Sequence, residues 1–150
     1  MNGEDFVRLF RFIARLRRER KSPRVYYGEE GWFGMRWEKE IRHHFHYCLA
    51  GINVGGILSN GDIMACPSIP RHFVQGNVRR DNFLDVWDRK FKEFRDWRWM
   101  RTGPCRDCGE FQHCRGGGLH LWDVERNRTR VCHYGLVRAY ERGRIKDMME

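Results

Sequence analysis

Four cysteines in the second half of the chain have the spacing of a metal site. Two residues separate Cys105 from Cys108, five separate Cys108 from Cys114, and seventeen separate Cys114 from Cys132. A Cys-x2-Cys pair holds one metal centre from a tight turn because its sulfurs converge, and two further thiolates complete the tetrahedron. The pattern fits either a structural zinc with four cysteine ligands or one four-iron cluster, and spacing alone does not separate them.

The composition favours metal-bound thiols over disulfides. The chain has 150 residues, of which 41% are hydrophobic and 33% charged, so one modest core is expected without covalent cross-links. No stretch approaches the roughly 18 apolar residues that a membrane span needs, and the N-terminus lacks a secretory pattern. We therefore expect a cytoplasmic protein, in which six cysteines more often bind metal or do redox chemistry.

The net charge of +9 raises a second hypothesis. A structural four-cysteine zinc domain with a basic, aromatic surface is one kind of nucleic-acid-binding protein. The arginines are spread along the chain among acidic residues, however, and no run of five like charges occurs. Scattered surface arginine is the preferred interpretation, and nucleic acid is not an expected partner.

The order of all six cysteines resembles the SPASM domain, the auxiliary-cluster extension of many radical S-adenosylmethionine (SAM) enzymes. Cys48 is followed after twelve residues by Gly61, and four residues later by Cys66, which is how the family pattern begins. The segment "QGNVRRDNFLDVWD" looks like the family's Gly-Asn turn and its Trp-bearing helix. More weakly, "YYGEEGWFG" is similar to the exit from the catalytic barrel, so the resemblance covers about residues 24 to 134.

The resemblance implies one complete cluster site and one degenerate site. Its ligands for one [4Fe-4S] cluster are Cys105, Cys108, Cys114 and Cys132, and a four-cysteine zinc remains the alternative. For the other site it offers only Cys48 and Cys66, because Gly118 stands where the family has a cysteine. The upstream candidates for replacing a ligand are His43, His44 and His46, which we interpret as surface or core residues.

The resemblance also implies a function and a missing part. No Cys-x3-Cys-x2-Cys motif is present, so SAM would bind only in a barrel that these residues do not contain, and no catalytic residue is assigned. We expect the C-terminal portion of such an oxidoreductase, or a split-gene product, not catalytically competent alone. It would serve electron transfer or substrate positioning, with a peptide or protein substrate and an electron donor or separate barrel chain as partners.

The elements that must position these cysteines predict an α+β fold. Hydrophobic periodicity predicts a basic amphipathic helix over residues 4 to 20, and Asn60-Gly61 predicts a two-residue hairpin turn with positive φ at both positions. We further expect a strand at 24–27, one aromatic helix over 81–98, and a last helix over about 135–148. The expected domains are a barrel remnant at 1–40, a SPASM-like domain at 41–134 and the helix at 135–150.

Overall fold

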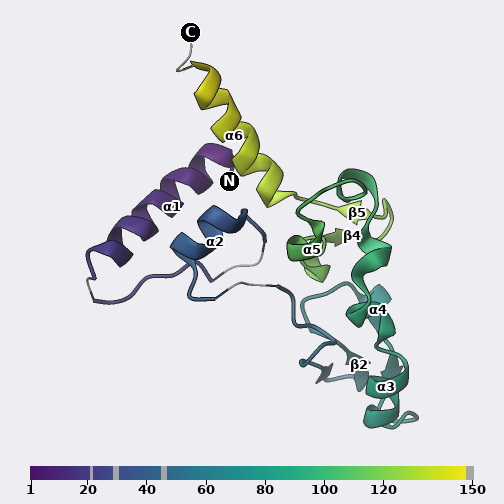
Figure 1. Cartoon of the computed structure of the whole chain (residues 1–150). Coiled ribbons are helices and arrows are strands. Elements are labelled where there is room, and N and C mark those ends of the chain that lie inside the picture. The colour runs from purple at the N-terminus through teal and green to yellow at the C-terminus, as the bar shows by residue number, and fades with distance from the viewer. Residues whose placement is uncertain (21, 29–30, 45–46, 148–150) are drawn as a thin grey trace. The chain divides into compact units, whose positions relative to one another are not determined.

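The structure, a computed structural model, describes residues 1–20, 22–28, 31–44 and 47–147, without the side chains of 144–147. It divides into two compact units: unit 1 comprises Met1–Tyr47 with Val131–Glu150, and unit 2 comprises Cys48–Arg130. The regular elements of the described residues are helices and two small antiparallel sheets, which confirms the α+β class (Figure 1). None of the described helices is both long enough and apolar enough to cross a bilayer.

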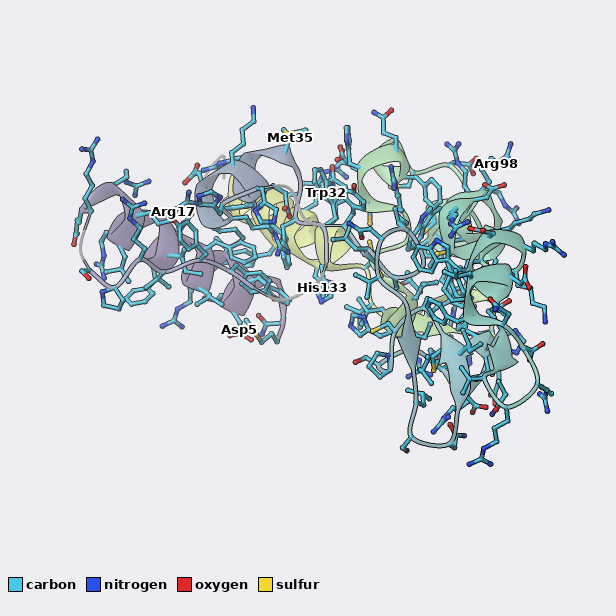
Figure 2. The ribbon with its side chains drawn as sticks, turned by 90° about the horizontal axis from the view of Figure 1, so that it is seen from below. Asp5, Arg17, Trp32, Met35, Arg98 and His133 are labelled. Atoms are coloured by element: carbon cyan, nitrogen blue, oxygen red, sulfur yellow. The ribbon has the colours of Figure 1, made fainter. Side chains whose placement is uncertain are left out.

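Unit 1 begins with the expected amphipathic helix α1, Gly3–Arg18. Asn2 caps it in a reciprocal capping box, in which the Asn2 side chain accepts from the Asp5 amide and the Asp5 carboxylate accepts from the Asn2 amide. Figure 2 shows Asp5 and Arg17 toward opposite ends of this helix. The acidic first turn and basic last turn both complement the helix dipole.

Helices α2, Met35–Ile41, and α6, His133–Asp147, pack with α1 around the core of unit 1 (Figure 1). Gly3 allows the close approach of α1 to α6, because a Cβ at this position would overlap the Leu136 carbonyl. The core is largely aromatic, with edge-on and tilted ring contacts, and consists of Phe6, Val7, Phe10, Ile13, Phe33, Trp37, Ile41 and Val137.

The strand expected at residues 24–27 does not form; this prediction is wrong. The segment is extended but finds no strand partner, and the Tyr27 amide donates to the Ile41 carbonyl at the end of α2. A buried ion pair anchors the segment instead. Arg42 and Glu38 lie 2.9 Å apart between Nε and Oε2, and the two guanidinium Nη atoms donate to the carbonyls of Tyr27 and Gly31.

Unit 2 contains the expected hairpin, β1 at Gly56–Ile57 and β2 at Asp62–Met64, with β3 at Gly76–Asn77 on the other side of β2. The predicted turn type is wrong. The Gly61 amide donates to the Leu58 carbonyl and Gly61 alone has positive φ (+89°), so the connection is a three-residue loop with glycine in the left-handed position. The Asp62 carboxylate fixes it by accepting from the side chains of Asn60, Arg71 and Asn77.

The single helix predicted over residues 81–98 is also wrong, because the segment breaks into α3 (Phe83–Arg89), α4 (Lys92–Arg95) and the 3-10 turn η2 (Trp97–Met100). Backbone carbonyls that would accept from backbone amides in a continuous helix accept from side chains instead. Arg95 donates to the Trp87 carbonyl, and the Trp99 indole donates to the Glu93 carbonyl at 2.7 Å. Asn82 caps the start of α3, where its side-chain oxygen accepts from the amides of Leu84 and Asp85.

Short elements complete unit 2. They are the 3-10 turns η1 (Arg71–Phe73), η3 (Gly103–Cys105) and η4 (Leu119–Leu121), the helix α5 (Phe111–Cys114), and the strand pair β4 (Trp122–Asp123) and β5 (Arg128–Thr129). One hydrophobic core holds unit 2 together. Its most buried members are Ile63, Met64, Phe91, Phe94, Met100, Leu119 and Trp122.

Candidate metal centre

Three of the four predicted ligands lie on one continuous, tightly turned segment of unit 2. Cys105 is the last residue of η3, and its amide donates to the carbonyl of Thr102, which precedes η3. The Cys108 amide donates to the Cys105 carbonyl. Cys114 ends the short helix α5, where its amide donates to the Glu110 carbonyl. Each of these three cysteines therefore takes part in a hydrogen-bonded turn of the backbone. Cys105 is 7% exposed and belongs to the core of unit 2.

The fourth predicted ligand, Cys132, belongs to unit 1 and immediately precedes α6. Its Sγ accepts the amide of Gly135 at 3.3 Å, so the sulfur occupies the capping position of that helix. A Cβ at Gly135 would lie 3.2 Å from the same sulfur, so glycine leaves room for it. Backbone N–H groups directed at sulfur are also how proteins support thiolate ligands of iron–sulfur centres.

The pair assigned to the degenerate site, Cys48 and Cys66, packs partly buried against the core of unit 2. The Cys66 Sγ accepts the Ser68 amide at 3.5 Å. Of the upstream histidines, His43 and His44 are exposed and contact each other edge-on, whereas His46 lies outside the described residues. All six cysteines lie within the described residues.

Gly118, the position where the family has a further cysteine, lies in a run of unusual backbone. Arg115, Gly116, Gly117 and Gly118 have φ of +49°, +80°, +88° and +131°. Residues other than glycine rarely adopt such backbone angles. A Cβ at Gly116 would also lie 2.7 Å from Met100 Cε. The Gly117 amide donates back to the Cys114 carbonyl at 2.9 Å, and Gly116 packs closely on Met100 of η2.

Across the described residues, no group of three or more His, Cys, Asp and Glu side chains is gathered closely enough to hold a metal ion. The donor set is nevertheless suited to a cluster. One orphaned donor supports this fit: the Trp97 indole N–H is buried in the same core as Cys105 and has no hydrogen-bond acceptor among the described residues. Buried donors are normally satisfied, and cluster sulfurs accept such bonds.

Sequence reasoning missed this tryptophan and the Gly135 amide. The aromatic pattern placed Trp97 on a packing face, and periodicity carries no signal for an unpaired N–H. Arg106, next to Cys105, is exposed, and its carbonyl accepts from the Arg101 side chain.

Comparison with known proteins identifies the central segment. Residues 48–109 match the SPASM family, described as an iron–sulfur cluster-binding domain. Mycofactocin maturase MftC of Mycobacterium tuberculosis is 40% identical over 80 residues, which cover 46% of this chain and 20% of the relative. The same maturase of Mycolicibacterium smegmatis is 39% identical, and that of Mycobacterium ulcerans 38% identical, over alignments of the same length.

The chain thus spans about a fifth of the length of the curated relatives it matches. No solved structure matches it significantly. The resemblance to the SPASM domain is confirmed for residues 48–109, a segment that includes Cys48, Cys66, Cys105 and Cys108 and ends before Cys114.

Proposed function

We propose that the protein is an iron–sulfur auxiliary module of a radical SAM enzyme that modifies peptides or proteins. The observation that carries this proposal is the SPASM match over residues 48–109, within which four cysteines lie. The similarity to mycofactocin maturases supports the same class of parent enzyme. The module serves electron transfer or substrate positioning, and SAM binds in a barrel outside these 150 residues.

The ligands of one [4Fe-4S] cluster are, in this proposal, Cys105, Cys108, Cys114 and Cys132. Such a cluster supplies a one-electron redox centre when bound. The chain's own part is to present the thiols and to exclude water. Support comes from the burial of Cys105 and from the Gly135 amide directed at the Cys132 sulfur.

Cys48 and Cys66 form the degenerate second site of the proposal and need no cluster of their own. Two thiolates are too few for a four-iron cluster, which takes four cysteine ligands in its usual form. The proposed cluster domain is 41–134, flanked by a barrel remnant at 1–40 and a terminal helix at 135–150. The proposed site of action is the cytoplasm, and the proposed partners are a peptide or protein substrate, an electron donor and a separate barrel.

Anaerobic purification and reconstitution with iron and sulfide test the metal. We expect brown protein with broad visible absorption and about four iron and four sulfide per chain. Colourless protein that holds one zinc and no sulfide after the same treatment would overturn the cluster and favour the structural zinc domain.

Cysteine variants test the ligand assignment separately. Replacing Cys105, Cys108, Cys114 or Cys132 by alanine removes a proposed ligand, so each variant should lose most of the bound iron. Cys48→Ala and Cys66→Ala are the matched controls, since they remove a partly buried thiol without touching the proposed site, and their iron content should stay near wild type. Equal loss from both groups would contradict the assignment.

A further inference from the structure

The outward face of α1 concentrates positive charge to a degree found nowhere else in the described chain. Between Arg8 and Arg24 the sequence has eight basic residues and one acidic residue. Arg8, Arg11, Arg15 and Arg18 fall within an arc of about 80° when α1 is drawn at 100° per residue, and they span about 15 Å along its axis. We call these four residues the arginine face. Glu4 is the acidic residue at the N-terminal end of the same arc.

Most of the charge on the arginine face is not neutralised within the described residues. Arg18 lies 3.7 Å from the Glu40 carboxylate, with its side chain 70% exposed. Arg8, Arg11 and Arg15 form no ion pair with any acidic side chain that the structure describes. Four like charges held on one helix face repel one another, so a polyanion bound there would relieve an unfavourable arrangement.

The surface is also hollowed at this place. A shallow depression of about 490 Å³ is lined by Arg8, Arg11, Phe12, Arg15 and Arg18. A second, of about 370 Å³, is lined by Leu16, Arg17, Arg20, Arg24 and Tyr26. Arg17 differs from its neighbours because its guanidinium donates to the Glu40 and Lys39 carbonyls at the end of α2. It therefore positions the helix, and the remaining arginines stay available to a ligand.

Two kinds of polyanion fit less well. A membrane-surface helix needs a free apolar face, whereas Phe6, Phe10 and Ile13 of α1 are at most 4% exposed in the core of unit 1. Proteins that bind single-stranded nucleic acid stack bases on aromatic rings. A guanidinium already lies over one face of each ring beside the arginines, Arg15 over Phe12 at 5.6 Å and Arg17 over Tyr26 at 4.8 Å from the ring centroid, which leaves less ring surface for stacked bases.

We propose that the arginine face binds an acidic segment of the peptide or protein substrate. Guanidinium groups donate paired hydrogen bonds to carboxylates in a bidentate geometry, and their spacing of three and four residues matches the carboxylates on one side of an acidic helix or strand. Phe12, which is 47% exposed at the edge of the depression, adds an apolar contact that a peptide side chain can use. This inference rests on the proposed function for the identity of the occupant.

The test is fluorescence anisotropy of the full chain with a labelled peptide of twelve residues in which glutamate alternates with leucine. Arg8→Gln/Arg11→Gln/Arg15→Gln should weaken binding by about tenfold, as expected for several exposed ion pairs, and wild-type affinity should fall with added salt. The matched control, Arg79→Gln/Arg128→Gln/Arg142→Gln, removes the same charge from exposed arginines elsewhere and should bind within about twofold of wild type.

Each other outcome overturns the inference. Equal loss in both variants would show attraction to net charge alone, and no loss in either would remove the arginine face from binding. Tighter, arginine-dependent binding of a single-stranded oligonucleotide of equal charge would make the surface a nucleic-acid site, and binding only to anionic vesicles a membrane site. Circular dichroism checks that α1 remains folded. Because iron content is measured separately, failure of peptide binding and failure of the cluster proposal are distinguished.

Discussion

The buried Arg42–Glu38 pair makes the sharpest prediction for unit 1. The two side chains are 3% and 0% exposed, and Arg42 also holds the carbonyls of Tyr27 and Gly31. Glu38 in turn accepts the Phe33 amide through its other oxygen. Arg42→Met keeps most of the apolar stem but leaves a buried carboxylate without its cation. Removing one partner of such a pair costs about 3–5 kcal/mol.

Hydrogen exchange measures this loss within unit 1 itself. A loss of about 3–5 kcal/mol accelerates exchange of the amides in α1 and α2 by roughly a hundred- to several-thousand-fold, limited by the stability of wild type. Amides in α3 and β2 of unit 2 are the internal control and should exchange at unchanged rates. Mass spectrometry of peptides from each unit reads both in one sample.

A double variant separates the charge from the packing. Glu38→Gln/Arg42→Met replaces the carboxylate by a neutral amide that still accepts the Phe33 N–H. It should therefore be more stable than Arg42→Met alone by at least about 1 kcal/mol. Exchange in Arg42→Met within threefold of wild type, or a double variant less stable than the single one, would refute the reasoning.

Three smaller predictions follow from local geometry. Gly116→Ala should destabilise unit 2 by about 1–3 kcal/mol, because φ is +80° and a Cβ would meet Met100, whereas Gly109→Ala, with nothing within 4 Å, should be nearly neutral in thermal melts. Asn2→Ala removes the cap of α1 and should cost about 1 kcal/mol in the same assay, and a loss below 0.3 kcal/mol would contradict the capping role. Hydrogen bonds from Arg98 lower the pKa of Asp96 to about 2, so this carboxylate stabilises the fold above about pH 4 and its contribution is lost as pH falls toward 2. Asp96→Asn should show a weaker acid dependence of the melting temperature between pH 2 and 5, and an unchanged dependence would count against the contact.

Local sequence signals were sufficient where one short segment decides the structure. The apolar periodicity predicted α1, because amphipathicity involves only residues of the same segment. The Asn60-Gly61 signal predicted the hairpin, although the three-residue loop differs from the predicted turn. There the Asp62 carboxylate adds hydrogen bonds from Arg71 and Asn77, which are remote from the turn itself.

The failures arise from long-range contacts. The aromatic periodicity of residues 81–98 is compatible with one helix, and only the side-chain bonds of Arg95 and Trp99 to backbone carbonyls explain its breaks. The segment 24–27 has β-prone residues, but a strand needs a partner, and Arg42 holds the segment by its carbonyls instead. For the site, spacing predicted four cysteine ligands, and this assignment stays a prediction, while the orphaned Trp97 N–H depends on packing that no motif encodes.

The close approach of α1 to α6 through Gly3 has a consequence for synthesis. Unit 1 is assembled from two segments, and the whole of unit 2 is inserted between them. A ribosome therefore releases every residue of unit 2 before it releases the helix α6 that α1 packs against. Unit 2 can complete its own core first, whereas the core of unit 1 lacks Val137 until α6 emerges. The order of translation thus favours folding of unit 2 before the core beneath the arginine face is complete.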